Sequence, residues 1–432
     1  MNVRVVMAGA LAAGLAVLAG CGAGVNRAQD RSYNIGVVTY VPGIADIPVS
    51  FLERYTGDTG NYILSSRGWQ DDFETLSEAA KRYDNMWEIV VTQLPDHYLC
   101  AGINNSGVVK ENVRMRVACQ RPEVSTFAGS SQGASGYVNN ASGEAARFNA
   151  PAAMAINSAT GTIYVADTNN DKIRAITATG QVSDFASVTA PRAVAVDPFG
   201  QVYVVTATTL MKFKSDGTLL NGTLATDLTS PGGLALDSMG DIYVSDPDAH
   251  VIWKISGNTK TVYAGQIGQD GQLDAASGTG ARFAMPNGLA FDRYDNLYVA
   301  DTFNSVIRKI AAKSGAVTTL SGPTDEVNDR YGLVSGQSRN VRFNYPLALT
   351  VDPKGNVWVA DTTNNAVRLV TTTGGGSTIA GLGSGTFGLV NGVPGVARFN
   401  NPSGIVIDAS GNLFIADTRN NAIRKVTFVS PS

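Results

Sequence analysis

Histidine and cysteine are scarce in this chain of 432 residues, which has two histidines and three cysteines. From residue 124 onward there is one histidine, His250, no cysteine and two glutamates, Glu144 and Glu326. A zinc site with imidazole or thiolate ligands is therefore excluded from that part. It also lacks a Gly-x-Ser-x-Gly nucleophile elbow, a Walker loop and a DxDxDG calcium loop. A calcium site made of Asp side chains and carbonyl oxygens is not excluded by these absences.

An excess of charge of one sign is also missing. The 33 Lys and Arg residues nearly balance the 36 Asp and Glu residues, for a net charge of -3. Without a basic stripe, nucleic acid is not an expected partner. With 44% hydrophobic residues, the chain can build one large repeat domain and a smaller one.

Only the N-terminus, MNVRVVMAGALAAGLAVLAGCGAG, has a long apolar run, and it is short for a membrane span. The sequence Leu-Ala-Gly-Cys that ends at Cys21 resembles the bacterial lipobox. This resemblance implies a signal peptide over residues 1–20, lipid on Cys21 and a tether over 21–31. Gly22 implies, by similarity to enterobacterial sorting rules, the outer membrane, with the side it faces left open. The alternative is an ordinary signal peptide followed by a chance cysteine.

Residues 32–120 contain alternating runs such as IGVVTYV, WEIVVTQL and VRMRVAC, which predict a small β-sandwich. Its end resembles a β-rich repeat of bacterial surface proteins. Cys100 and Cys119 form an even pair in a chain expected to be exported, so we predict a disulfide between them. A metal site is the weaker alternative because histidine is so scarce.

From residue 124 to 430 one phrase recurs. VADTNNDKIRAI at 165 returns as VADTFNSVIRKI at 299, VADTTNNAVRLV at 359 and IADTRNNAIRKV at 415. Each copy belongs to a unit that begins with Pro and contains three alternating runs, usually preceded by a fourth. Alternation predicts strands with two faces. The six units begin at Pro151, Pro191, Pro231, Pro286, Pro346 and Pro402.

Six such units resemble a six-bladed NHL-repeat β-propeller. We therefore expect an all-β protein, with the propeller over residues 124–430 behind the sandwich. The chain enters with a fourth-strand sequence, VSTFAG at 124, but lacks a fourth strand after the last unit. VSTFAG should therefore complete the last blade and close the ring.

The aspartate of the repeated phrase stands where the second strand turns into the third. We predict that it accepts hydrogen bonds from turn amides, and that the threonine beside it fixes the loop in the same way. The arginine seven residues later is expected to pair with this aspartate or with its neighbour. A ring of metal-binding carboxylates is the alternative. The aspartates are Asp167, Asp246, Asp301, Asp361 and Asp417, with Thr206 in the second unit.

The connections before four of the six units are about twenty residues long, whereas those before Pro191 and Pro231 are short. We expect the long ones to form a crown around the channel mouth. They share an Arg-Phe pair, whose arginines are Arg147, Arg282, Arg342 and Arg398. The phenylalanine is expected to pack and the arginine to be solvated; alternatively, the arginines form an electropositive ring that holds an anion or acidic glycan.

The residue after each unit's proline should lie near the channel mouth, and there the units differ. Arg192, Asn287 and Ser403 are the candidate ligand-binding residues, and no catalytic residue or cofactor is identified. In blade three, Asp248 and His250 are local departures from the repeated phrase.

We expect a monomeric, lipid-anchored scaffold of the cell envelope whose propeller face binds a protein, peptide or glycan. Related propeller enzymes imply an alternative, a calcium-dependent lactonase- or lyase-like activity; a third is a purely structural envelope protein. The amidating lyases' zinc-binding histidines are absent.

Overall fold

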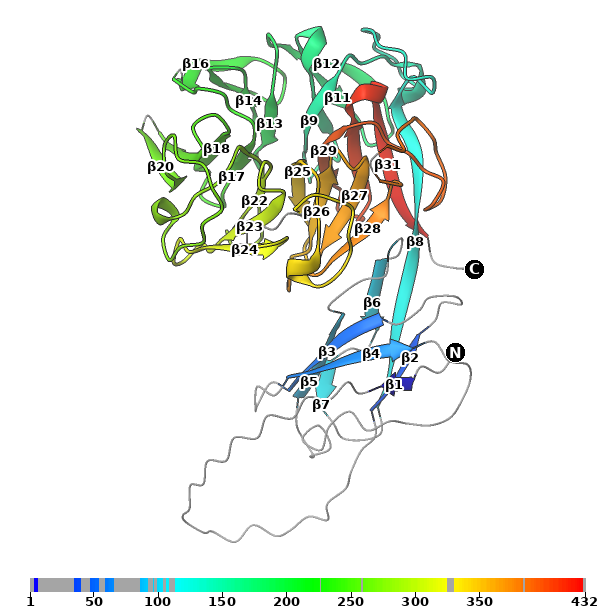
Figure 1. Ribbon diagram of the computed structural model, residues 1–432. Helices are drawn as coiled ribbons and strands as arrows, with labels where there is room; N and C mark the ends of the chain where they lie inside the picture. The colour runs from blue at the N-terminus through cyan, green and yellow to red at the C-terminus, as the bar shows by residue number, and fades with distance from the viewer. Residues whose placement is uncertain are drawn as a thin grey trace, which may run out of the picture. The chain divides into compact units, whose positions relative to one another are not determined.

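The computed structural model describes residues 113–225, 227–257, 259–324, 330–383 and 385–429, together with Asp96 and seven short strands before residue 113 (Figure 1). The chain divides into two compact units, Met1–Gln120 with Ser430–Ser432, and Arg121–Val429. No helix within the described residues is long and apolar enough to cross a membrane.

The first unit contains a five-stranded sheet in the order β1-β4-β3-β5-β7, while β2 and β6 pair with the first half of β8. The register of β6 and β8 makes Cys100 and Cys119 Cα partners. Their side chains lie outside the described residues, as do Cys21 and most of the segments assigned to signal and tether. The sandwich, the disulfide and the lipid anchor stay predictions. The strands are β1 Arg4–Val6, β2 Ile35–Thr39, β3 Ile47–Glu53, β4 Thr59–Ser65, β5 Met86–Val91, β6 Leu99–Ile103, β7 Ser106–Val108 and β8 Val113–Gly129.

The second unit is a six-bladed β-propeller, which confirms the fold expected from the repeats. Its blades are four-stranded antiparallel sheets around a common axis (Figure 1). Blade one comprises β9 Pro151–Ile156, β10 Ile163–Asp167, β11 Lys172–Ile176 and β12 Val182–Ser187. Blade two comprises β13 Ala193–Val196, β14 Val202–Val205, β15 Leu210–Phe213 and β16 Leu219–Ala225. Blade three comprises β17 Leu234–Leu236, β18 Ile242–Asp246, β19 Val251–Ser256 and β20 Thr259–Gly265. Blade four comprises β21 Pro286–Phe291, β22 Leu297–Asp301, β23 Val306–Ile310 and β24 Val317–Ser321. Blade five comprises β25 Pro346–Val351, β26 Val357–Asp361, β27 Ala366–Val370 and β28 Gly376–Ala380. Blade six comprises β29 Pro402–Ile407, β30 Leu413–Asp417, β31 Ala422–Val429 and the second half of β8.

The ring closes as the sequence predicted. The second half of β8 pairs antiparallel with β31, from Gly129 opposite Ala422 to Arg121 opposite Val429. In Figure 1 the cyan β8 lies beside the red β31. The innermost strands contact one another around the axis, including β29 with β9. No blade is therefore left with an unpaired closing edge.

Small residues let the innermost strands approach closely. The second residue after each unit's first proline is Gly or Ala, and the reason is visible at Gly288. A Cβ there would lie 2.7 Å from both the Cα of Ala348 and the carbonyl oxygen of Leu347. At Gly404 it would lie 2.6 Å from the carbonyl oxygen of Ala152. This close approach gives the propeller a narrow centre.

The repeated phrase forms a buried hydrogen-bonded cluster, as blade four illustrates. Asp301 is 0% exposed; its carboxylate accepts from the amide of Ala284 at 2.8 Å, from Asn304 Nδ2 at 2.9 Å and from Arg308 Nη1 at 2.8 Å. Arg308 also donates to the carbonyl oxygen of Arg282 at 2.9 Å. This confirms the structural role of the aspartate. We name this set the Asp-Asn-Arg cluster; its other copies are Asp167, Asn170 and Arg174; Asp361, Asn364 and Arg368; and Asp417, Asn420 and Arg424.

The threonine of the phrase contacts the neighbouring blade rather than its own loop. Thr302 Oγ1 donates to the carbonyl oxygen of Pro346 at 2.7 Å, which ties blade four to the first residue of blade five. The same bond follows from Thr168 to Pro191, from Thr362 to Pro402 and from Thr418 to Pro151. One phrase therefore fixes both a loop and a blade contact.

Blades two and three, which follow the short connections, lack the arginine. By strand register Met211, opposite Val204, takes its place in blade two, and in blade three Trp253 Nε1 donates to Asp246 at 3.1 Å. In the other blades the arginine's guanidinium group donates hydrogen bonds to carbonyl oxygens of the long loop. The same group lies over the buried phenylalanine of that loop; in blade four the guanidinium carbon of Arg308 is 5.0 Å from the ring centroid of Phe283. The arginine therefore accompanies the long loop.

The unequal loop lengths are confirmed, but the predicted crown is wrong. The long loops extend along the outer part of the ring and pair with the outermost strand of the blade that follows, at Asn140 with Val182 and Ala275 with Val317. Their phenylalanines are fully buried. Because blades radiate from an axis, the gaps between them widen outward, and these loops fill the gaps instead of surrounding the mouth.

Candidate functional site

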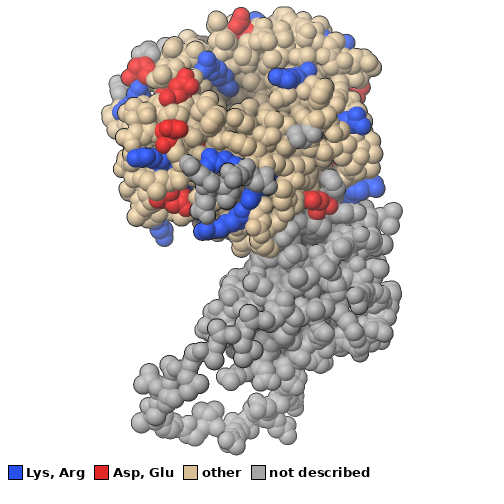
Figure 2. Space-filling view, viewed as in Figure 1, with Lys and Arg blue, Asp and Glu red and all other residues tan. Residues whose placement is uncertain are grey.

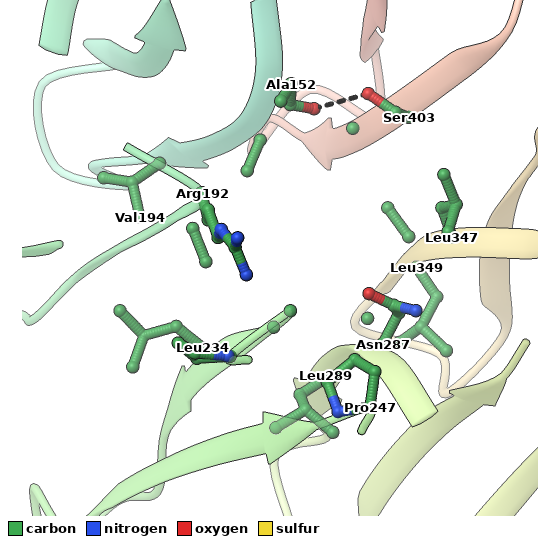
Figure 3. A pocket seen from close by; sticks show the side chains of 18 of the residues that line it. Ala152, Arg192, Val194, Leu234, Pro247, Asn287, Leu289, Leu347, Leu349 and Ser403 are labelled. Atoms are coloured by element: carbon green, nitrogen blue, oxygen red, sulfur yellow. Dashed lines mark hydrogen bonds between the residues drawn. The ribbon is translucent and has the colours of Figure 1, made fainter. Parts of the chain in front are cut away.

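A cavity of about 400 Å³ lies at the centre of the propeller (Figure 3). All six blades contribute to it through the first three residues after their leading prolines. The prediction that the residue after each proline lies near the channel is confirmed. These six residues are Ala152, Arg192, Gly232, Asn287, Leu347 and Ser403. The rest of the wall is mostly apolar, as is usual for a small-ligand site.

Arg192 is the one cation among the lining residues. It is exposed, and Figure 3 shows its guanidinium group extending from blade two into the cavity. Ser230 Oγ, at 3.1 Å from Nη1, is its hydrogen-bond partner within the described residues. A planar guanidinium with most of its donors available is suited to a carboxylate or phosphate, which it can bind through two hydrogen bonds.

Asn287 lies across the cavity from Arg192 (Figure 3). Its Nδ2 donates to the carbonyl oxygen of Met285 and to Thr302 Oγ1, both at 3.3 Å, and its amide oxygen faces the cavity. Gly232 on the neighbouring blade makes room for it, because a Cβ there would lie 2.2 Å from Asn287 Oδ1. The side chain is thus held with its acceptor oxygen directed into the cavity.

Ser403 lines the cavity, but its hydroxyl already has two protein partners. It lies 2.8 Å from the carbonyl oxygen of Ala152 and 2.5 Å from Thr418 Oγ1. The bond to Ala152 connects blade six to blade one (Figure 3), whereas the contact with Thr418 lies within blade six. They give Ser403 a structural role that the sequence did not reveal.

The four arginines of the long loops do not line the cavity. Arg147 Nη1 donates to three carbonyl oxygens of its own loop, that of Ala146 at 2.7 Å, and Arg342 Nη1 donates to that of Arg339 at 2.8 Å. The loops run outward, so they carry these side chains away from the axis. This placement agrees with packing of the phenylalanine rather than with an electropositive ring at the channel.

The aspartates of the repeated phrase are enclosed by donors. Burial raises the pKa of Asp361 and Asp417 to about 6 each, because loss of hydration outweighs the effect of their arginines, which lower it. Burial also raises the pKa of Asp301. Among the described residues, no cluster of three or more His, Cys, Asp or Glu is placed to hold a metal ion.

At the mouth, Asp248 also lines the cavity, and His250 Nδ1 accepts a hydrogen bond from the amide of Met285 at 3.2 Å. His250 has φ of 60°, so it occupies a tight turn and connects blades three and four. Charged side chains are scattered over the visible face of the propeller (Figure 2). The positive charge at the cavity therefore comes from Arg192 in its lining, not from a cluster of like charges on the surface around it.

Sequence reasoning missed a second repeated phrase in the long loops. Gly-x-Val or Gly-x-Leu precedes each Arg-Phe pair, and its glycine carbonyl accepts from the asparagine of the Asp-Asn-Arg cluster, as Gly271 does from Asn304 at 2.8 Å. The following Leu273 pairs with Arg282. The signal was present in the sequence as GYV, GQL, GLV and GLV.

The family model for the NHL repeat matches residues 343–368 and 399–426, which lie in blades five and six. NHL repeat-containing protein 2 of Homo sapiens is 36% identical over 152 residues, which cover 33% of this chain and 21% of the relative. Protein SUPPRESSOR OF QUENCHING 1, chloroplastic, of Arabidopsis thaliana is 27% identical over 306 residues, 68% of this chain and 26% of the relative. This chain thus corresponds to only a minor part of these relatives. The propeller contains NHL repeats.

Among solved structures, a protein of unknown function from Bacteroides thetaiotaomicron has a TM-score of 0.58 at 19% identity, covering 90% of this chain and 100% of the other. An auxiliary nutrient binding protein from the same organism has a TM-score of 0.58 at 16% identity, covering 88% and 90%. At these identities the similarity shows the fold alone.

Proposed function

We propose that this protein is a binding scaffold whose central cavity takes an anionic group of a peptide, protein or glycan ligand. The observation that carries the proposal is Arg192, a cation inside a largely apolar cavity whose guanidinium keeps donors available beyond its bond to Ser230. Asn287 supplies an acceptor on the opposite side. One similar propeller is named an auxiliary nutrient binding protein, which agrees with binding as a use of this fold.

The proposal extends to the location of the protein. The lipobox-like sequence at Cys21 supports a lipid anchor in the outer membrane, and the opposed positions of Cys100 and Cys119 on β6 and β8 support a disulfide. Replacing Cys21 with Ser should abolish incorporation of radiolabelled palmitate into the protein. Equal labelling of the parent and the variant would contradict the lipid anchor.

The ligand proposal is tested by thermal-shift titration of the Cys21→Ser protein with envelope glycans and peptides, in calcium and in EDTA. A ligand bound through its anionic group should raise the melting temperature equally in both. Arg192→Ala should weaken its binding roughly ten- to hundredfold, because a charge-assisted hydrogen bond is lost. Arg293→Ala, at an exposed arginine of blade four, is the matched control.

Two results would oppose the scaffold. Unchanged affinity in Arg192→Ala would remove Arg192 from the site. A calcium-induced rise in melting temperature that EDTA reverses, together with calcium-dependent cleavage of lactones or esters, would favour the enzyme alternative instead.

A further inference from the structure

The lining of the central cavity contains one charge of each sign. Arg192 is its cation, and Asp248 is its anion. Both side chains belong to the described part of the chain, are exposed and form no ion pair with each other. Arg192 Nη1 donates to Ser230 Oγ, whereas the carboxylate of Asp248 has no hydrogen-bond partner within the described residues. Two opposite charges are therefore available to one ligand.

Asp248 lines the cavity because blade three departs from the repeated phrase. It stands two residues after the aspartate of that phrase, and the residues at the same position in other blades, such as Phe303 and Arg419, do not line the cavity. Pro247 restricts the backbone just before it. The amide of His250 donates to the carbonyl oxygen of Pro247 at 3.2 Å and closes the turn. The carboxylate is thus presented on a closed turn.

Blade three carries a second carboxylate that no arginine neutralises. Asp246 is 0% exposed and accepts from neutral donors, which are Trp253 Nε1 at 3.1 Å and the amides of Thr229 and Ser230, both at 3.2 Å. In blades one, four, five and six an arginine pairs with the equivalent aspartate. Because Ser230 lines the cavity, the negative charge of Asp246 lies next to the cavity wall and adds to that of Asp248.

Oxygen acceptors accompany these carboxylates. The amide oxygen of Asn287 faces the cavity from blade four (Figure 3). At four blade junctions a threonine donates to the carbonyl oxygen of the next leading proline, but in blade two Ala207 stands in its place. The carbonyl oxygen of Pro231, a lining residue, therefore lacks this donor. An ammonium group has three donors and no acceptor, so such a set of oxygens suits it.

The other half of the lining is apolar. Blades one, five and six contribute no charged side chain to it. Its two hydroxyl groups are already used, because Thr168 donates to the carbonyl oxygen of Pro191 at 2.9 Å and Ser403 to that of Ala152 at 2.8 Å. This half suits an apolar group of a ligand. Its large side chains are Met154, Leu347, Leu349 and Ile405.

We propose that the cavity binds a small zwitterion, an apolar amino acid or dipeptide. Arg192 binds its carboxylate, and Asp248 and Asn287 bind its ammonium group. The inference rests on the proposed function and narrows it from an anionic group to one that has an ammonium group on the same molecule. Arg192 would attract a ligand with a carboxylate alone and Asp248 would repel it, whereas a zwitterion has a partner for each charge. The cavity of about 400 Å³ lies toward the small end of the range for small-molecule sites, about 300–1,000 Å³.

The test is isothermal titration calorimetry of the purified full-length protein with leucine, leucyl-leucine and two blocked forms of the dipeptide. N-acetyl-leucyl-leucine keeps the carboxylate and loses the positive charge, while leucyl-leucine amide keeps the ammonium group and loses the negative charge. Each block should weaken binding by at least about tenfold, because one charge-assisted contact is lost and a charge of the protein stays unpaired. Tighter binding of leucine would assign the amino acid, and tighter binding of leucyl-leucine the dipeptide.

Asp248→Asn separates the contributions of the two charges. It should weaken the binding of leucyl-leucine about tenfold but strengthen that of N-acetyl-leucyl-leucine, because the repulsion of the carboxylate is removed. Arg192→Ala should weaken the binding of both. Asp270→Asn, at an exposed aspartate of the β20–β21 loop that does not line the cavity, is the matched control and should bind both as the parent does.

The results that oppose this inference differ from those that oppose the proposed function. Absence of binding of both leucine and leucyl-leucine at millimolar concentration, or equal affinity of Asp248→Asn and the parent for leucyl-leucine, would overturn the zwitterion. Binding of N-acetyl-leucyl-leucine as tight as that of leucyl-leucine, and lost in Arg192→Ala, would also overturn it but would leave the anion site intact. Binding of leucyl-leucine that Arg192→Ala does not change would refute both.

Discussion

Replacing Arg308 with Met should destabilise the propeller by about 3–5 kcal/mol. Arg308 and Asp301 are both 0% exposed and lie 2.8 Å apart. Without the arginine, Asp301 keeps two neutral donors, Ala284 and Asn304, but its charge is uncompensated. The carbonyl oxygens of two loop residues lose a donor as well. The free energy of unfolding, measured with urea and tryptophan fluorescence, gives the magnitude.

The pH dependence of this loss has a definite sign. Burial raises the pKa of Asp301, while Arg308 lowers it, so the substitution should raise the folded-state pKa further above the unfolded value. The variant then gains stability relative to the parent as pH falls, because protonation removes the buried charge, and it loses that gain as pH rises through the folded-state pKa. The difference between parent and variant should therefore be smaller at pH 5 than at pH 7.

Two variants make this reasoning refutable. Combining Asp301→Asn with Arg308→Met should cost less than the sum of the single changes, because neither charge then remains alone. Arg293→Met, at an exposed arginine of the same blade, should cost within about 0.5 kcal/mol. A loss below about 1 kcal/mol for Arg308→Met, or strict additivity in the double variant, would show that the pair does not hold the blade.

Three further predictions concern the ring. Thr362→Val should cost about 1–2 kcal/mol in urea unfolding, because the carbonyl oxygen of Pro402 loses its donor at 2.7 Å; a Ser replacement should retain most of the stability. Gly288→Ala should lower the melting temperature, because its Cβ would collide with the neighbouring strand, and an unchanged value would argue against close strand approach. Burial raises the pKa of Asp361 and Asp417 to about 6, above the unfolded value, so their contribution to stability is present at low pH and is lost as pH rises through 6. Replacing both with Asn should remove that part of the stability change measured between pH 5 and pH 7, and an unaltered profile would contradict the assignment.

Much of the fold could be predicted because the information is repeated. Alternating residues in every unit indicate strands, and six prolines count the blades. The unmatched fourth strand at residue 124 predicted closure, which β8 and β31 confirm. The repeats did not predict the path of the long loops, because the length of a loop does not tell whether it runs toward the channel mouth or outward between the blades. Only the partners of Asn140 and Ala275 show that they fill the gaps between blades.

The sequence by itself determined the strands, the number of blades, the closing strand and the residues that face the axis, because each of these depends on local spacing. Tertiary structure alone decided what those residues do. Ser403 and Arg192 occupy equivalent positions, yet the hydroxyl is held by Ala152 and Thr418 while the guanidinium reaches into the cavity. That difference depends on groups far apart in the chain, which a repeat pattern does not record.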